Sequence, residues 1–158
     1  MQANIDGDLI AYRCSASVKE EEPLDIALYR TDQLMRQLLE ETGSSHFRCF
    51  LTGKENFRRK INPLYKANRT QEPPKYLQEC KQFLIDEWKA ESSLYLEADD
   101  LLGIHQAPDT VICTLDKDLL MVPGQHYSWQ ISGANWVREA RWETTKAFDG
   151  IRYFYQQM

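Results

Sequence analysis

Residues 109–122 have the sequence DTVICTLDKDLLMV, in which one apolar run leads through two acids into a second apolar run. Residues 109–115 are typical of a buried strand, and residues 116–122 predict a short helix. Asp116 and Asp118 therefore fall where a strand ends and a helix begins. This order of strand, acids and helix indicates both the fold and the position of a site.

The same order occurs at two other places in the chain. Residues 3–6 predict a short strand that leads into a helix over residues 7–17, and residues 92–97 are strand-like and lead into a helix over residues 98–106. The acids at these two junctions are Asp6, Asp8, Glu97, Asp99 and Asp100. Three acidic clusters are therefore expected in the same structural position.

The remaining pattern supplies further helices and strands. Apolar residues at three- and four-residue spacing predict a helix over residues 24–42 that stops at Gly43. A second amphipathic helix is expected to begin at Pro73 or Pro74, because proline is favoured in a first helical turn. Further strands are expected at residues 46–52 and 126–132, and a terminal helix at residues 143–158. Large aromatics upstream of and within that helix are expected to pack in the core; they are Trp129, Trp136, Trp142, Tyr153, Phe154 and Tyr155.

Strands that alternate with helices predict an α/β fold with a mainly parallel central sheet and helices on both faces. A length of 158 residues favours one domain over residues 1–158. With 42% hydrophobic and 27% charged residues, and no long apolar run or secretory signal, we expect a soluble protein of the cytoplasm without membrane contact.

Cysteine and histidine are too scattered to form a transition-metal cluster, so any metal is expected to be held by oxygen. The cysteines are predicted to be reduced core thiols, and they are Cys14, Cys49, Cys80 and Cys113. The net charge of −5 argues mildly against a nucleic-acid binder, so the local charge matters.

The three acidic clusters follow strands, and the carboxyl ends of parallel strands share one edge of a sheet. Capping of helix N-termini is the structural alternative, but one aspartate would serve each helix and the sequence supplies seven acids. The surplus favours Mg²⁺ or Mn²⁺, and two such ions about 4 Å apart suit phosphodiester hydrolysis. One acid of the middle cluster is expected to act as a cap or through water, and the pattern leaves open which one.

Residues 53–75 concentrate positive charge in an otherwise acidic chain. The bases are Lys54, Arg58, Arg59, Lys60, Lys66, Arg69 and Lys75. A solvated surface segment is one interpretation of this run. The other is an interface for a nucleic-acid strand, because Tyr65, Lys66 and Arg69 combine a stacking surface with two phosphate-binding cations.

The motifs IDGD, NPLYKANR, LEADDLLG and TLDKDLLMVPG follow one another in this order. With them, the chain resembles the 5'-3' exonuclease and flap endonuclease family, in particular the exonucleases of short-tailed bacteriophages. The resemblance runs from the first residues to the last predicted helix. It implies a PIN-like nuclease core with an arch-like basic segment around residues 53–75. The implied substrates are DNA with 5' ends, flaps or duplex, or RNA in RNA–DNA hybrids. The implied process is DNA replication, and the implied location is the cytoplasm, which is that of the host if a phage encodes the protein.

The resemblance also implies roles for individual residues. The implied metal ligands are Asp6, Glu97, Asp99, Asp100, Asp116 and Asp118. The implied catalytic residues are Asp6, Asp99, Lys66 and Arg69, with the two bases beside the scissile phosphate. The implied nucleic-acid contacts are Arg58, Arg59, Tyr65, Lys66 and Arg69.

Two departures from the family pattern bear on activity. Gly53 stands where the family carries a further aspartate, and the chain ends before the family's GD…DN segment, which opens a helical DNA-binding module. We therefore expect a second metal ion to be weakly held, the isolated chain to have low activity, and a separate protein to be one possible source of the missing module.

Two other functions are compatible with parts of the sequence. A catalytically weak or inactive nuclease-like module that binds nucleic acid or a partner is the main alternative, given Gly53 and the missing segment. A haloacid-dehalogenase-type phosphatase would explain IDGD alone, but the apolar strand before Asp6 is short and no Ser or Thr follows Asp8 closely.

Overall fold

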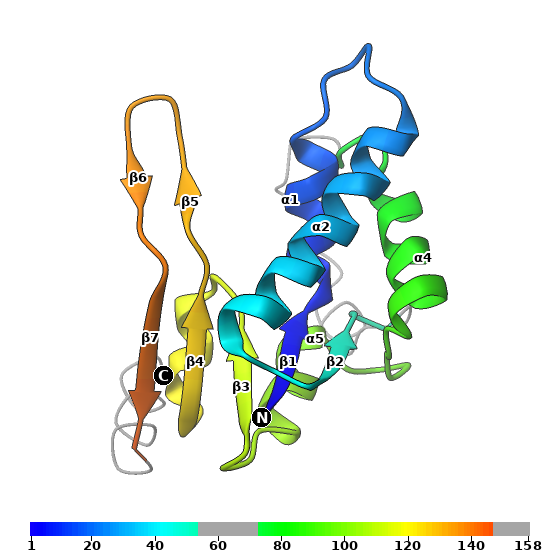
Figure 1. Cartoon of the computed structure of the whole chain (residues 1–158). Helices are drawn as coiled ribbons and strands as arrows, with labels where there is room; N and C mark the ends of the chain where they lie inside the picture. The colour runs from blue at the N-terminus through cyan, green and yellow to red at the C-terminus, as the bar shows by residue number, and fades with distance from the viewer. Residues whose placement is uncertain (54–72, 147–158) are drawn as a thin grey trace, which may run out of the picture.

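The computed structural model describes residues 1–53 and 73–146 of the chain, and Figure 1 shows their arrangement. The strands are β1 (Gln2–Asp6), β2 (His46–Phe50), β3 (Thr110–Cys113), β4 (Gly124–Ser128), β5 (Ile131–Ser132), β6 (Val137–Arg138) and β7 (Arg141–Thr145). The helices are α1 (Gly7–Ala16), α2 (Leu24–Thr42), α4 (Leu77–Trp88), α5 (Ala98–Ile104) and the 3-10 helix η1 (Lys117–Met121). Up to β4, each strand is followed by at least one helix, as predicted.

Five strands form one sheet in the order β2-β1-β3-β4-β7. The neighbours from β2 to β4 run parallel, and β7 runs antiparallel to β4 at the edge. The short strands β5 and β6 pair as an antiparallel hairpin that extends beyond β4 and β7 (Figure 1). The prediction of a mainly parallel central sheet is confirmed.

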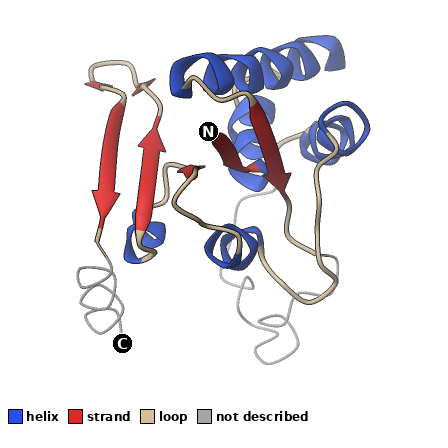
Figure 2. Ribbon diagram, turned by 60° about the horizontal axis from the view of Figure 1, so that its bottom comes forward, coloured by secondary structure: helices blue, strands red, loops and turns tan. Residues whose placement is uncertain are grey.

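Successive side chains of a strand point to opposite faces of the sheet, and β3 shows how this divides the core. Val111 and Cys113 belong to an apolar cluster with buried residues of α1, α2 and α4. Ile112, between them, belongs to a second cluster with α5 and η1. Figure 2 shows helices on both sides of the sheet. The prediction of helices on both faces is therefore confirmed.

The helix boundaries agree with the sequence pattern at most points. Helix α2 ends at Gly43, whose φ of 65° is the left-handed conformation that glycine adopts without strain. Helix α4 begins at Leu77 and not at Pro73 or Pro74, because the amide of Leu77 closes a turn onto the carbonyl of Pro74 at 3.2 Å. Of the helices within the described ranges, none is both long enough and apolar enough to span a membrane.

Two predicted elements are wrong. Residues 92–97 form a turn and extended loop instead of a strand; only Glu91 pairs with the sheet, through a bridge to Phe50. Residues 143–145 belong to β7 instead of a helix, because their backbone pairs with β4 across the sheet edge. The rest of the predicted terminal helix, from residue 147 on, lies outside the described residues.

The prediction that the tryptophans pack in the core holds for one of the three. Trp129 is buried, whereas Trp136 is 54% exposed and Trp142 is 47% exposed on the β6 and β7 side of the sheet. Trp136 lies in the turn between β5 and β6, and Trp142 lies in the edge strand β7, where its ring contacts that of Tyr127. The aromatics at residues 153–155 lie outside the described residues. All four cysteines are buried and free, as predicted.

Candidate active site

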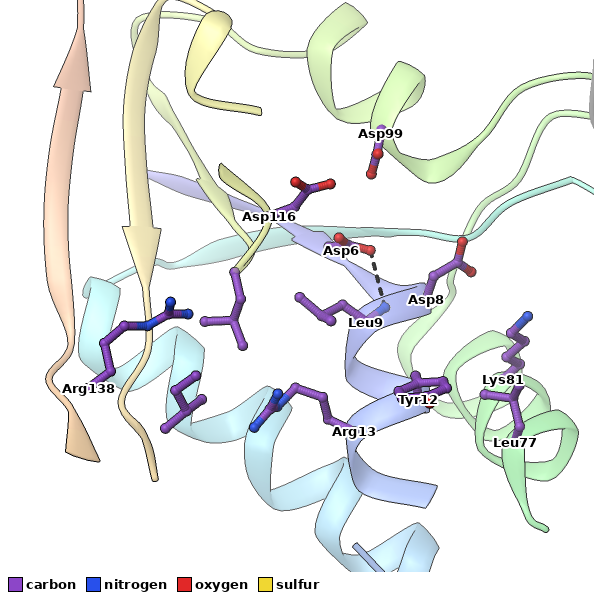
Figure 3. Close-up of a pocket in the computed structure, with 12 residues that line it drawn as sticks. Asp6, Asp8, Leu9, Tyr12, Arg13, Leu77, Lys81, Asp99, Asp116 and Arg138 are labelled. Carbon is purple, nitrogen blue, oxygen red and sulfur yellow. Dashed lines mark hydrogen bonds between the residues drawn. The ribbon is translucent and has the colours of Figure 1, made fainter. Parts of the chain in front are cut away.

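One cavity of about 470 Å³ lies at the carboxyl ends of β1 and β3. Figure 3 shows four aspartates from different elements around it: Asp6 at the end of β1, Asp8 in α1, Asp99 in α5 and Asp116 after β3. Parallel strands end at the same edge of a sheet, which explains why residues so far apart in sequence meet. The structure therefore brings one or more acids of each predicted cluster to a single cavity.

Asp6 is the most deeply buried of these acids, with 4% of its surface exposed. Its carboxylate accepts hydrogen bonds from the amide of Leu9 at 3.2 Å, as the N-cap of α1, and from the hydroxyl of Thr114 at 2.9 Å. Burial raises the pKa of Asp6 to about 6, and the charges of Asp8 and Asp116 act in the same direction. Asp6 is thus both a structural cap and a perturbed acid.

Asp99 lies in the first turn of α5 and faces the other aspartates across the cavity (Figure 3). Burial raises the pKa of Asp99 to about 7, and nearby carboxylates add to this shift. These carboxylates, in decreasing order of effect, are those of Asp6, Asp116, Glu97 and Asp8. Like charges gathered at one place disfavour the ionised form of each acid, so the carboxylates of the cavity repel one another.

Thr114 connects the acids at the ends of β1 and β3. Its hydroxyl donates to the carboxylate of Asp6 and accepts from the amide of Asp116 at 3.1 Å. Asp116 is the N-cap of η1 and accepts from the amide of Asp118 at 2.9 Å. A single buried hydroxyl therefore fixes the two acids relative to each other.

Asp8 was noted in the sequence but not expected to be a ligand, and the structure places it in the cavity. Its carboxylate accepts from the amide of Thr52 at 3.1 and 3.2 Å, and from the hydroxyl of Thr52. Gly53 follows, and a Cβ atom there would lie 1.8 Å from the carbonyl oxygen of Ser93. Thr52, and not Gly53, is the residue of this segment whose side chain contacts the acids.

Three of the expected metal ligands do not line the cavity. Asp100 is exposed and its carboxylate accepts from the amide of Glu97 at 3.1 Å, so it caps α5. Glu97 is buried at the N-terminus of the same helix and acts on Asp99 through its charge. Asp118 is exposed in η1. Glu97 and Asp100 together form the capping box of α5, in which each side chain accepts from the backbone amide of the other residue.

Three cations line the same cavity and were not expected from the sequence. Arg13 extends from α1, Lys81 from α4 and Arg138 from β6, and Figure 3 shows Lys81 and Arg138 on opposite sides of the acids. Arg13 follows Leu9 by four residues, a helical spacing that could have indicated it. Nothing local marks Lys81 or Arg138, because their positions depend on how α4 and the hairpin pack.

The basic residues expected to bind the substrate fall in residues 54–72, outside the described residues. They are Arg58, Arg59, Tyr65, Lys66 and Arg69. Their placement relative to the cavity stays a prediction.

The donors around the cavity are chemically suited to a hard divalent cation. Its lining contains four carboxylates and neither histidine nor cysteine, which favours Mg²⁺ or Mn²⁺ over a softer metal. Within residues 1–53 and 73–146, no three His, Cys, Asp or Glu side chains are grouped closely enough to hold an ion as they stand. The residues therefore fit such a cation by type and charge, without forming a closed ligand shell.

Comparisons with known proteins identify the family. The family model described as 5'-3' exonuclease, N-terminal resolvase-like domain, matches residues 3–147. A comparison with curated proteins gave no match. A bacteriophage T5 protein co-crystallised with metal ions shares 16% identity at a TM-score of 0.59, over 81% of this chain and 55% of that one.

Two further T5 structures are similar to this chain. A mutant of the T5 5'-exonuclease shares 14% identity at a TM-score of 0.55, over 81% of this chain and 49% of the other. A T5 flap endonuclease variant, in a pseudo-enzyme-product complex with DNA and metal ions, shares 15% identity at a TM-score of 0.55. The match covers 81% of this chain and 54% of the other. At such identities these structures show the fold, and the chain spans about half of their length. The family match over residues 3–147 shows that the chain belongs to the 5'-3' exonuclease family, as its N-terminal resolvase-like domain.

Proposed function

We propose that this chain is a 5' nuclease domain that depends on a divalent metal and hydrolyses phosphodiester bonds at 5' ends, flaps or duplex regions of DNA. The observation that carries the proposal is the gathering of Asp6, Asp8, Asp99 and Asp116 around one cavity, in a member of the 5'-3' exonuclease family. RNA in RNA–DNA hybrids is a further proposed substrate. The proposed setting is DNA replication in a cytoplasm, that of the host if a phage encodes the chain.

The proposed ligands of Mg²⁺ or Mn²⁺ are the acids of the three clusters. Asp6, Asp99 and Asp116 would hold one ion, with Asp8 as a further ligand from the same cavity. Glu97, Asp100 and Asp118, which lie outside the cavity lining, would hold a second ion more weakly. When bound, such ions activate water and stabilise an oxyanion leaving group. The mutual repulsion of the cavity acids supports this proposal, because a cation would remove it.

The chain's own residues would prepare the site in three ways. Thr114 holds the carboxylate of Asp6 in one orientation by donating to it at 2.9 Å. Asp6 and Asp99, whose pKa values are raised to about 6 and about 7, would release protons when a cation binds. Asp6 and Asp99 would then be ionised when the scissile phosphate enters the cavity.

Cations of the chain would bind the anionic substrate around these acids. Arg13, Lys81 and Arg138 line the cavity and are proposed to contact phosphates beside the scissile one. Lys66 and Arg69 are proposed to lie at the scissile phosphate. Arg58, Arg59 and Tyr65 are proposed to hold the strand. A separate protein could supply the grip on duplex DNA that the helical module gives in the family.

One observation favours a second candidate function. Within the described ranges, no three His, Cys, Asp or Glu side chains lie close enough together to hold a metal ion. The alternative is therefore a catalytically weak or inactive module that binds nucleic acid or a partner. The two functions differ in the fate of the substrate. A nuclease cleaves it, whereas a binding module only retains it.

The test incubates the purified chain with 5'-labelled flap and blunt duplex DNA in Mg²⁺ or Mn²⁺. We expect slow cleavage that needs the metal and that Asp99→Asn and Asp116→Asn reduce by about a hundredfold or more, as expected for ligands of the reacting centre. Asp109→Asn is the matched control, because Asp109 is exposed at the opposite end of β3. A small aryl phosphate should not be hydrolysed.

Two results would contradict the proposal. DNA binding without cleavage at any metal concentration would favour the binding module. Cleavage that persists in both cavity variants would point to a contaminating nuclease.

A further inference from the structure

Thr52 lies just after β2 and contacts two elements of the cavity. Its amide donates to both oxygens of the Asp8 carboxylate, at 3.1 and 3.2 Å, and its hydroxyl donates to one of them. The same hydroxyl accepts from the amide of Ala98 at 3.2 Å. A hydroxyl offers one donor and two acceptor sites, so both contacts are satisfied together.

The contact with Ala98 ties Asp8 to helix α5. Ala98 is the first residue of that helix, whose opening amides have no partners inside the helix. Asp99 is the next residue and faces the cavity. The hydroxyl of Thr52 thus joins Asp8 to the helix that carries Asp99, because it donates one hydrogen bond to Asp8 and accepts one from Ala98.

The backbone around Thr52 is fixed by the loop that precedes α5. The amide of Leu51 donates to the carbonyl of Glu91 at 2.8 Å, and the amide of Gly53 donates to the carbonyl of Leu96 at 2.9 Å. Gly53 has no room for a side chain against Ser93. Residue 52 is therefore held on both sides, and its side chain is presented to Asp8.

We propose that Thr52 is a positioning residue for divalent-metal binding, which sets the separation and orientation of Asp8 and Asp99. This inference rests on the proposed metal-dependent function of the same cavity. Thr52 contributes a neutral hydroxyl, so it orients a carboxylate without adding a further negative charge to four that already repel one another. Partners of this kind, one step removed from the metal, orient the ligands that touch it.

The test compares Thr52→Val with Thr52→Ser in Mn²⁺ titrations followed by isothermal titration calorimetry, without any nucleic acid. Valine keeps the shape of threonine and removes the hydroxyl, whereas serine keeps the hydroxyl. We expect Thr52→Val to raise the Kd for Mn²⁺ about tenfold and Thr52→Ser to change it less than about threefold. Thr42→Val is the matched control, because the buried Thr42 hydroxyl donates to Leu38 within α2.

A double-mutant cycle with Asp8→Asn separates positioning from general destabilisation. If Thr52 acts through Asp8, Thr52→Val changes the Kd by less than about twofold in the Asp8→Asn background. A purely structural role would instead lower the melting temperature with unchanged Kd. Should Thr52→Val fold poorly, the Kd for Mn²⁺ is measured in Asp8→Asn and in Thr52→Ser. Asp8→Asn then tests the Thr52–Asp8 contact from the side of Asp8, with Thr52→Ser as the variant that keeps the hydroxyl.

The outcomes distinguish this inference from the proposed function. A Kd for Mn²⁺ in Thr52→Val within twofold of wild type would overturn the role of Thr52 and leave the nuclease proposal intact. Weakened Mn²⁺ binding in a chain that never cleaves DNA would support Thr52 and overturn the nuclease. A wild-type chain that binds no Mn²⁺ would overturn both.

Discussion

Asp99 shares its cavity with three other aspartates, and burial together with their charges raises its pKa to about 7 from an ordinary value of 3.8. The folded protein therefore holds the proton of Asp99 more tightly than the unfolded chain does. Without metal, this contribution to the free energy of unfolding is complete below about pH 4 and is lost as the pH rises through about 7. The metal-free domain should be less stable at pH 8 than at pH 5.

Asp99→Asn should remove this penalty, since an amide cannot ionise. We expect the variant to raise the free energy of unfolding at pH 8 in EDTA by about 1 to 2 kcal/mol, after allowance for solvent screening. It should leave the value at pH 4 nearly unchanged. Urea unfolding at pH 8 and at pH 4 measures the two free energies of unfolding, with Asp109→Asn as the exposed control. A variant less stable than wild type at pH 8 would contradict the assigned charge repulsion.

Single residues of the site could be predicted where a local pattern carries them. Asp6 and Asp116 follow apolar strands at helix starts, and adjacent parallel strands end at one edge of the sheet. Asp99 also lies at a helix start but follows a loop, so the packing of α5 on the sheet places it. Thr52 and Arg138 carry no such signal, because their roles come from contacts with residues far away in the chain. The sequence pattern draws attention to Gly53, whereas the side chain of this segment that contacts Asp8 is that of Thr52.

At the scale of elements, the segment after β2 and the loop before α5 form one unit. Gly53 is the point of closest approach, since a Cβ atom there would meet the carbonyl of Ser93 at 1.8 Å and that of Leu94 at 2.8 Å. Both neighbours are backbone atoms, which cannot move aside as a flexible side chain can. The unit therefore holds the start of α5, and with it Asp99, against β2.

Gly53→Asp should accordingly fail to restore the acid that the family carries in this segment. We expect it to lower the free energy of unfolding by about 2 kcal/mol or more, because the backbones of two segments must separate. Nuclease activity should fall along with stability. Gly43→Asn is the matched control, because asparagine tolerates the φ of 65° and nothing lies within 4 Å of the new Cβ. A Gly53→Asp variant of wild-type stability and higher activity would show that the segment opens easily.

Elements were predictable where periodicity was long and were missed where tertiary pairing decided. Helix α2 has enough turns for its apolar spacing to fix both ends. Residues 92–97 have strand-like composition, but of their backbone groups only the carbonyl of Leu96 pairs with the segment after β2, by accepting from the amide of Gly53, so no ladder forms. The sequence pattern predicts a helix at residues 143–145, yet pairing with β4 at the sheet edge makes them a strand.

At the scale of the whole molecule, the site is a product of the sheet order. Strands β1 and β3 are adjacent, so the acids at their carboxyl ends meet, and α5 covers the opposite face and brings Asp99 to the same edge. Alternating strands and helices were sufficient to predict a mainly parallel sheet with acids at one edge, but not the order of its strands or the loop that precedes α5. The antiparallel edge strand β7 and the hairpin that carries Arg138 were not predictable, because nothing local distinguishes them from the parallel strands.

The same arrangement makes metal binding and pH act on the stability of the entire domain. A cation that binds only the folded state raises its stability by mass action, by about 2.7 kcal/mol at a hundred times the Kd. Protons compete for Asp6 and Asp99, whose pKa values are about 6 and about 7. Millimolar Mn²⁺ should therefore raise the melting temperature by several degrees at pH 7.5 and much less at pH 5.5.

Differential scanning fluorimetry of wild type and Asp116→Asn at both pH values, with EDTA as the reference, measures this coupling. The variant should lose most of the Mn²⁺ effect at pH 7.5, because Asp116 lines the cavity. An equal rise at both pH values would mean that the ion binds away from Asp6 and Asp99. Since the metal would replace the protons that these acids hold, the pH at which Mn²⁺ begins to stabilise the domain reports directly on the charge gathered at the sheet edge.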